Sequence, residues 1–379
     1  MARLGDICII NPKTPVIDDN LTVSFIPMPK VGENGEFDAS EIKEYREVKK
    51  GFTYFQNGDV LFAKITPCME NGKGAVARML ENGIGFGSTE FHVLRPKDGN
   101  VLSKWIYYLL SWSNFRKEAE NNMTGSAGQK RVPKSFLENY NVMLPPLEKQ
   151  KNQIDSLAKI DDVITLRKQQ LSKLDELVKS RFIELFDNEE YEKVTVSSVL
   201  NTGFWLMPAT PEFIVDGEVP YITSKNIKSR TIDFDNVKYI SREAYQSISA
   251  NRPTQKGDIL VSMIGTLGQI AVIQDDRAFY GQNLYLLRLN SSIIDTTYFC
   301  EFFNSDAVQH ELQGKRNQST QAYLKANHVE DLVLPLPPMG LQQQFAAFVE
   351  QIDKSKLEIQ NSLEKLETLK KALMQKYFG

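Results

Sequence analysis

The sequence predicts a protein of the α+β class, with two tandem mixed α/β domains that are each followed by a long helix. The two helices are expected to pair as an antiparallel coiled coil, which would give the molecule pseudo-two-fold symmetry. Three observations support this prediction. A repeat recurs at a constant offset, apolar residues recur at heptad spacing after each of two Leu-Pro-Pro segments, and strand signals follow the same order in both halves of the chain.

The repeat is clearest in two segments that begin with Leu-Pro-Pro, at residues 144–146 and 336–338. Aligned without a gap, Leu171 matches Leu363, an offset of 363 − 171 = 192 residues. Small solenoid repeats have periods of roughly 20–50 residues, so this offset indicates a duplicated module of domain plus helix. Two similar domains held at a fixed distance suggest a molecule that reads two sites at once.

Both repeated segments have the apolar spacing of a coiled-coil seam, with polar interruptions at Arg167, Lys356 and Lys370. Proline cannot continue a helix, so each Leu-Pro-Pro segment marks where a helix begins. An alternative in which each helix packs only on its own domain stays open, although the constant offset favours pairing. The seam residues expected to pack between the helices and to support partner contacts are Leu157, Ile160, Ile164, Leu171, Leu174, Val349, Ile352, Leu363 and Leu366.

These signals divide the chain into four segments: a first domain at 1–146, a first helix at 147–188, a second domain at 189–338 and a second helix at 339–379. In the first domain we expect a turn and strand at 58–65, a strand at 91–95 and a helix from 105 to about 121. The second domain repeats these landmarks at 257–261, 286–288 and 298–303. Its Gly-Asp turn is offset by 257 − 58 = 199 residues, so loops of different length lie nearby. One fold with two different binding surfaces would have this pattern.

The composition is that of a globular protein, with 41% hydrophobic and 25% charged residues. No apolar run approaches the roughly 18–20 residues of a membrane span. Three scattered cysteines without CxxC spacing favour a reducing compartment, and we expect a cytoplasmic protein without membrane association. The net charge of −3 argues against a protein that simply coats DNA, but it leaves room for a local DNA-binding face.

Motifs for catalysis are missing, so we expect no catalytic residue, metal or cofactor in this chain. The sequence has no P-loop, and Asn11-Pro12-Lys13 lacks the following proline and aromatic residue of an adenine methyltransferase motif. The three histidines have no zinc-site spacing, and His92 in a strand is typical of a structural histidine. Asp59 and Asp258 each follow glycine before a strand, which indicates turn residues more than catalytic carboxylates.

Loops at 66–74 and 124–131, with a counterpart at 315–321, combine small residues, amides, hydroxyls and cations. Glycine permits close approach to a phosphate, and Lys, Arg, Asn and Gln can read base edges. Ordinary solvated loops are the plainer alternative, but equivalent loops in both copies combine Gln, Ser or Thr with cations. The predicted DNA-binding residues are Lys64, Thr66, Asn71, Lys73, Ser88, Thr89, Ser126, Gln129, Lys130 and Arg131 in the first domain, and Lys225, Asn226, Ser262, Thr266, Gln282, Asn283, Arg316, Gln318, Ser319 and Gln321 in the second.

Residues 58–75 (GDVLFAKITPCMENGKGA), 87–96 (GSTEFHVLRP) and 125–132, with the two helices, resemble the specificity subunit of type I restriction–modification enzymes. The resemblance covers the whole chain. It implies that each domain is a target recognition domain for one half of a bipartite double-stranded DNA sequence, and that the helices form a spacer that sets the gap. It also implies that two methyltransferase subunits dock on the spacer and that restriction/translocase subunits can join. S-adenosylmethionine, ATP and Mg are then expected on those partners, and this subunit is expected not to be catalytic.

The second copy departs from the first, with Met-Ile-Gly-Thr-Leu-Gly at 263–268 where the first has Ile-Thr-Pro-Cys at 65–68. This difference predicts half-sites of different sequence. We also expect weak DNA binding by the isolated chain and strongly salt-dependent binding by the complex. Three alternatives remain. The chain could serve a related restriction system whose partner fuses methylation and cleavage, or it could be a scaffold with two ligand-binding domains. A standalone methyltransferase or nuclease is the least favoured.

Overall fold

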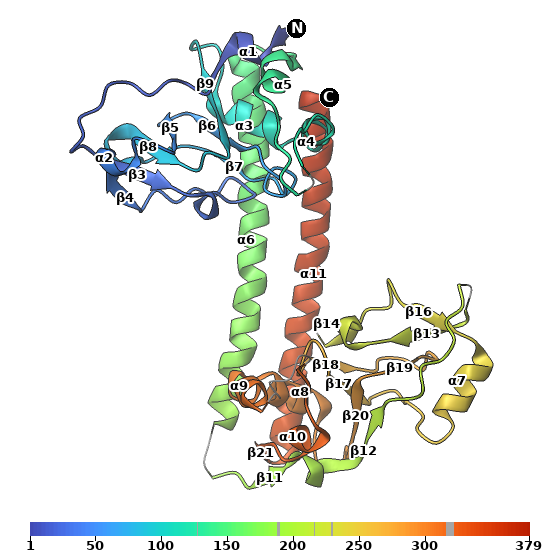
Figure 1. Ribbon diagram of the computed structural model, residues 1–379. Helices are drawn as coiled ribbons and strands as arrows, with labels where there is room; N and C mark the ends of the chain where they lie inside the picture. The colour runs from blue at the N-terminus through green and yellow to red at the C-terminus, as the bar shows by residue number, and fades with distance from the viewer. Residues whose placement is uncertain (127, 188–189, 216, 229, 316–321) are drawn as a thin grey trace. The chain divides into compact units, whose positions relative to one another are not determined.

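A computed structural model describes residues 1–126, 128–187, 190–215, 217–228, 230–315 and 322–379 (Figure 1). The chain forms two compact units. Unit 1 contains residues 1–168 and 361–379, and unit 2 contains residues 169–360. Each unit therefore combines one α/β domain with part of each long helix. The boundaries of the two units consequently differ from a division of the chain into four consecutive segments.

Unit 1 is built on two four-stranded sheets. The first has the order β2 (Cys8–Ile10), β9 (Phe91–Pro96), β6 (Val60–Ala63) and β7 (Gly74–Val76), with antiparallel pairing throughout. The second has the order β4 (Ile42–Glu44), β3 (Thr22–Ile26), β8 (Ile84–Gly87) and β5 (Thr53–Gln56), in which β3 and β8 are parallel. The strands predicted at 58–65 and 91–95 are confirmed as β6 and β9.

Strand β6 separates two cores because successive side chains of a strand point to opposite faces. Val60 and Phe62 face a core that contains aromatic residues of the helices, whereas Leu61 and Ala63 face a core shared with the second sheet. All four residues are buried, which explains why the strand is apolar throughout instead of alternating.

The remaining elements of unit 1 are short. They are β1 (Ala2–Arg3) paired with β10 (Asn141–Val142), helices α1 (Leu4–Ile7), α2 (Tyr45–Val48), α3 (Ser103–Ser111), α4 (Ser113–Asn121) and α5 (Lys134–Asn139), and 3-10 turns η1 (Met28–Lys30) and η2 (Glu81–Gly83). The single helix predicted from 105 to about 121 is wrong in one respect. Trp112 is extended at φ −64° and ψ 132°, which separates α3 from α4, and its ring is buried in the helix-side core.

Unit 2 repeats this topology. One sheet has the order β12 (Leu200–Leu206), β20 (Leu284–Leu289), β17 (Ile259–Ser262) and β18 (Ile270–Val272), and the other has the order β16 (Lys238–Ile240), β13 (Val219–Ile222) and β19 (Tyr280–Gly281). The described residues 252–255, which correspond to β5, form no strand. They include Pro253, which has no N–H to donate to a sheet.

The other elements of unit 2 are two strand pairs, β11 (Lys193–Thr195) with β21 (Val333–Pro335) and β14 (Ile227–Lys228) with β15 (Thr231–Ile232), and four helices, α7 (Arg242–Ser249), α8 (Thr296–Asn304), α9 (Asp306–Gly314) and α10 (Ala326–Glu330). Two 3-10 turns, η3 (Val196–Val199) and η4 (Ser224–Asn226), complete the unit. The strand and helix predicted at 286–288 and 298–303 are confirmed as parts of β20 and α8.

The two long helices are confirmed as α6 (Leu147–Phe186) and α11 (Met339–Phe378). Within unit 2 they run antiparallel, because Asp175 pairs with Lys356 and Phe186 meets Phe345 (Figure 1). The same two helices are also in contact within unit 1, where Lys370 Nζ lies 2.6 Å from a carboxylate oxygen of Asp161. The alternative in which each helix packs only on its own domain is therefore wrong.

The predicted seam residues are all buried or half-buried. Leu157, Ile160, Val349 and Leu363 are buried, and Ile164, Leu171, Leu174, Ile352 and Leu366 are half-buried. The two lysines that interrupt the apolar pattern are also half-buried, and each pairs with an aspartate of the facing helix at 2.6 Å. A lysine can occupy such a position because its methylene stem covers apolar surface while its ammonium group reaches a partner.

Each long helix is anchored to its own domain by a buried glutamine near its start. Gln150 Nε2 donates to the carbonyls of Asn100 and Pro145, at 2.9 and 2.8 Å, and its Oε1 accepts the Leu102 N–H at 3.0 Å. Gln342, at the equivalent position, makes the same three contacts in unit 2, with Ile293 and Pro337 carbonyls and the Asp295 N–H. These contacts set the position of each domain on its helix.

Candidate nucleic-acid interface

Three segments of the first domain converge beyond the end of β6, although they are far apart in the sequence. The Lys64 N–H donates to the carbonyl of Glu90 at 2.9 Å, and the Val132 N–H donates to the carbonyl of Lys64 at 2.9 Å. The Thr66 N–H donates to the carbonyl of Lys130 at 3.0 Å. Residues predicted on three separate loops are thereby brought together into one surface.

An ion pair holds two of these segments together. Arg131 Nε and Nη2 donate to the two carboxylate oxygens of Glu90 at 2.9 and 2.8 Å. The hydrogen bond from Arg131 is the main reason that the pKa of Glu90 lies below its ordinary value. The Arg131 side chain is 41% exposed, so it remains accessible from solvent while its orientation is fixed.

The neighbouring side chains add polar groups to the same surface. Lys64 is half-buried, and burial lowers the pKa of its ammonium group, an effect that the Glu90 carboxylate opposes. Ser88 accepts the Glu90 N–H at 3.2 Å. The predicted residues that lie exposed around this pair are Thr89, Ser126, Gln129 and Lys130.

A buried arginine donates hydrogen bonds to the backbone of the β6–β7 connection, which carries several of the predicted residues. Arg116 of α4 donates to the carbonyls of Met69 and Gly72, at 2.5 and 2.9 Å, and burial lowers its pKa to about 10. Asn71 is exposed, whereas Lys73 donates to the Met28 carbonyl at 3.4 Å. A further predicted residue, Thr66, donates to Glu70 Oε1 at 3.1 Å.

Sequence reasoning missed Glu90 and Arg116 as members of this surface. Glu90 lies 41 residues from its partner Arg131, and Arg116 lies 44 residues from Gly72. No local spacing signals such contacts, so only the folded chain reveals them.

The second domain builds the same backbone frame. The Met263 N–H donates to the Asn283 carbonyl at 3.2 Å, and the Leu324 N–H donates to the Met263 carbonyl at 2.9 Å. Asn283 and Tyr323 therefore occupy the positions that Glu90 and Arg131 hold in the first domain. The predicted residues Arg316, Gln318, Ser319 and Gln321 lie outside the described residues.

The other predicted residues of the second domain differ in accessibility. Ser262 is fully buried, with its hydroxyl bonded to the Thr266 carbonyl and the Gln269 N–H. Asn226 uses its amide group to bridge Thr223 and the Asp233 carbonyl. Both side chains are therefore engaged within their own loops. Gln282 accepts a hydrogen bond from the Tyr221 hydroxyl at 3.4 Å, and the residues left exposed are Lys225 and Thr266.

The residues interpreted as structural have structural contacts. Asp59 is buried and accepts two hydrogen bonds from Arg95, at 2.8 and 2.7 Å, and Asp258 makes the equivalent pair with Arg288. His92 is buried, with Nε2 2.8 Å from the Val132 carbonyl, and burial lowers its pKa.

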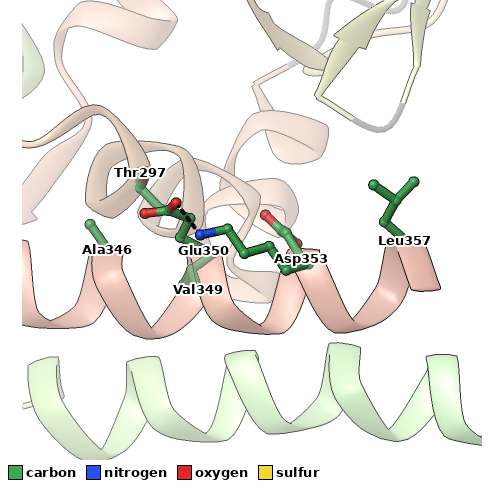
Figure 2. Close-up of a pocket in the computed structure, with 7 residues that line it drawn as sticks. Thr297, Ala346, Val349, Glu350, Asp353 and Leu357 are labelled. Carbon is green, nitrogen blue, oxygen red and sulfur yellow. Dashed lines mark ion pairs between the residues drawn. The ribbon is translucent and has the colours of Figure 1, made fainter. Parts of the chain in front are cut away.

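A shallow groove of about 350 Å³ lies on α11 of unit 2, beside the first turn of α8 (Figure 2). Its charged groups include Glu350 and Lys354, which form a helix-surface ion pair at 2.7 Å. Leu357 projects from the same helix and is 62% exposed. The groove thus offers an apolar and ion-paired surface.

Across the parts of the chain that the structure describes, no three His, Cys, Asp or Glu residues are grouped so that they could hold a metal ion. Among those same residues, no helix combines the length and apolar content needed to cross a bilayer.

A sequence model described as Type I restriction modification DNA specificity domain matches residues 1–176 and 188–371. The chain belongs to this family. The two matched stretches each contain one α/β domain, which agrees with the duplication. The resemblance drawn from the motifs of the sequence is thereby confirmed.

Two Escherichia coli members of the family align with part of the chain. The type I restriction enzyme EcoAI specificity subunit is 44% identical over 198 residues, and the EcoEI specificity subunit is 40% identical over 198 residues. Each alignment covers 50% of this chain and 33% of the relative, so the match spans about a third of the length of these relatives.

A solved structure matches the whole fold. A chain from a structure titled for complex assembly and conformational transition of the type I R-M system superposes with a TM-score of 0.62. The superposition covers 99% of this chain and 96% of that chain at 16% identity, so it concerns the fold alone.

Proposed function

We propose that this chain is the DNA sequence-recognition subunit of a type I restriction–modification complex. In this proposal each domain reads one half of a bipartite target in double-stranded DNA, and the paired helices α6 and α11 fix the gap between the half-sites. The chain itself is not catalytic, and S-adenosylmethionine, ATP and Mg act on partner subunits in the cytoplasm.

The observation that carries this proposal is the matching backbone frame of the two domains with different side chains on it. Lys64 and Met263 accept and donate equivalent backbone hydrogen bonds, yet the flanking residues differ between the copies. Glu90 and Arg131 are replaced by Asn283 and Tyr323. Side chains that reach base edges specify sequence, so two such frames suit two different half-sites.

The long helices offer surface for methyltransferase subunits, which we propose as two docked partners, with restriction/translocase subunits able to join. Several large apolar side chains point away from the helix seam and are between 47% and 62% exposed. We propose that the methyltransferase subunits cover these side chains. These residues are Leu166, Leu177, Ile183, Leu357 and Leu369.

The proposal is tested by mapping methylated adenines across the genome of the host, with and without the gene for this chain. The expected result is a bipartite motif with a fixed unspecified gap that is methylated only when the gene is present. A methylation pattern that does not change on deletion would contradict the proposal.

Substituting Lys130 and Arg131 together with glutamine separates DNA recognition from a scaffold role. A recognition subunit should lose methylation of its motif, whereas a scaffold protein should retain it. The identity of co-purified subunits distinguishes separate methyltransferase partners from one that fuses methylation and cleavage. S-adenosylmethionine binding by the purified chain would instead favour an enzyme.

A further inference from the structure

The guanidinium group of Arg131 is only partly used by the protein. Arginine has five N–H donors. Glu90 accepts two of them, from Nε and Nη2, and the Gln129 carbonyl accepts one from Nη1 at 2.9 Å. Among the described residues, this leaves one N–H on Nη1 and one on Nη2 for another molecule. Both terminal nitrogens of the planar group can therefore still donate.

Two donors on the terminal nitrogens of one planar group match guanine. Its O6 and N7 atoms are two acceptors on the major-groove edge, and bidentate contact from arginine is the commonest specific base contact. The arrangement is also pre-organised, because Glu90 fixes the plane of the guanidinium group before DNA is bound. A free arginine would lose side-chain entropy on binding, which the Glu90 contact reduces.

We propose that Arg131, held in place by Glu90, reads a guanine in the half-site of the first domain. Arg131 is the base-reading residue, and Glu90 is a positioning residue. This inference rests on the proposed function. It goes further by assigning one base to one side chain in one of the two half-sites.

The second domain has no arginine–glutamate pair at the equivalent positions. At the positions of Glu90 and Arg131 it has Asn283 and Tyr323, neither of which provides a cationic fork. Asn283 has a left-handed backbone with φ 64°, so the local chain direction differs as well. Among the described residues at these equivalent positions, the arginine–glutamate pair is accordingly found in the first domain alone.

The test uses the complex of this chain with its methyltransferase subunits. Duplexes carry the methylated motif of the host with each base pair of the first half-site changed in turn. Methylation rates are compared for the wild-type complex and for R131K, R131Q and E90Q. Losing a good bidentate contact should reduce discrimination at one G·C pair by about 5- to 150-fold. Discrimination at every other position, including the second half-site, should stay at the wild-type level.

The three variants separate base reading from charge and from folding. Lysine keeps the positive charge but not the planar fork, so R131K should retain methylation of the motif while losing most of the discrimination at that pair. E90Q should lose part of it at the same pair. Arg78 supplies the matched control, because it is an exposed arginine that follows β7 at the end opposite to Lys64, and R78Q should leave discrimination unchanged.

Two results would overturn the inference. R131K with wild-type discrimination would show that no fork is used. A loss of methylation on all duplexes by R131Q that R131K largely restores, with thermal unfolding unchanged, would indicate a phosphate contact in place of a base contact. If the wild-type complex methylates no bipartite motif, the proposed function itself is contradicted. If the motif has no guanine in the first half-site, the inference about Arg131 is contradicted but the proposed function is not.

Discussion

Replacing Gln342 with alanine should destabilise unit 2 by about 3 kcal/mol. Gln342 is fully buried near the start of α11, and it accepts the N–H of Asp295 at 2.8 Å. Asp295 is the N-cap residue of α8, so this contact ties the start of one helix to the start of another. The side chain also donates to the carbonyls of Ile293 and Pro337 at 3.3 and 2.8 Å.

The magnitude follows from three backbone groups that would lose their partner, one in a buried contact and two in part-buried contacts. A buried polar group left without a hydrogen bond costs about 1–3 kcal/mol, and a carbonyl with a second lone pair is at the low end of that range. Alanine has a slightly better helix propensity than glutamine, which offsets a few tenths of a kcal/mol at most. For a unit of about 190 residues, a loss of about 3 kcal/mol should lower Tm by about 6–12 °C.

Thermal and urea unfolding of the purified chain measures this effect, and hydrogen exchange at residues 293–298 assigns it to the junction. Gln343 provides the control, because it is the next residue of the same helix and is exposed, so Gln343→Ala should be close to neutral. A Tm difference of less than about 2 °C between the two variants would refute the claim that this glutamine fixes the domain on its helix. Gln150→Ala should have the equivalent effect in unit 1.

Three other predictions concern partners, pH and salt. Leu177 and Leu369 occupy equivalent positions and are 47% and 48% exposed. Leu177→Asp and Leu369→Asp should abolish co-purification with methyltransferase subunits while leaving Tm unchanged. Retained co-purification would place the docking surface elsewhere. The pKa of Glu90 is lowered in the folded chain, so its stabilising effect is present above the ordinary value of 4.5 and is lost as pH falls through the folded pKa. Acid unfolding curves should therefore show E90Q losing less stability than the wild type below about pH 4.5. Lys130→Gln should reduce the slope of log K against log salt for DNA binding by the complex by about one, and an unchanged slope would exclude a phosphate contact by Lys130.

The sequence alone predicts the elements that have a regular apolar spacing or a clear turn signal. The helix beginning at Leu147 was predicted to its first residue because Leu-Pro-Pro precedes a sustained heptad pattern. Strands β6 and β17 were predicted because a Gly-Asp turn precedes each, and both glycines have positive φ, at 90° and 89°. Apolar spacing reports burial directly, so these features need no knowledge of distant contacts.

Elements that depend on distant contacts were not predictable. The sheet around β8 consists of short strands, and its pairing joins β3 and β8 across about 60 residues. Trp112 interrupts the helical pattern, and its ring is buried in the core. The local sequence contains no helix-stop signal that would predict this break. Ser262 has the residue type of a DNA contact, but its hydroxyl is bonded within its own loop. Residue type alone does not show whether a polar group is already satisfied.

The duplication divides the chain into parts with different physical roles. Some contacts occur in both units with the same chemistry, such as the aspartate–arginine pairs behind the Gly-Asp turns and the glutamines at the helix starts. In unit 1, Trp105 of the first domain contacts Phe378 at the end of α11. In unit 2, Tyr298 of the second domain contacts Phe186 at the end of α6. Each domain therefore packs against the end of the long helix that follows the other domain.

The contacts shared by both units support what the two units have in common, which is the domain fold and its attachment to a helix pair. The positions that differ, Glu90 with Arg131 against Asn283 with Tyr323, lie on an equivalent backbone frame, which forms with either pair of residues. A side chain that can change without altering the frame is free to be selected for what it contacts outside the protein. Under the proposed function, this separation would let one fold present two recognition surfaces that differ at the positions of Arg131 and Tyr323.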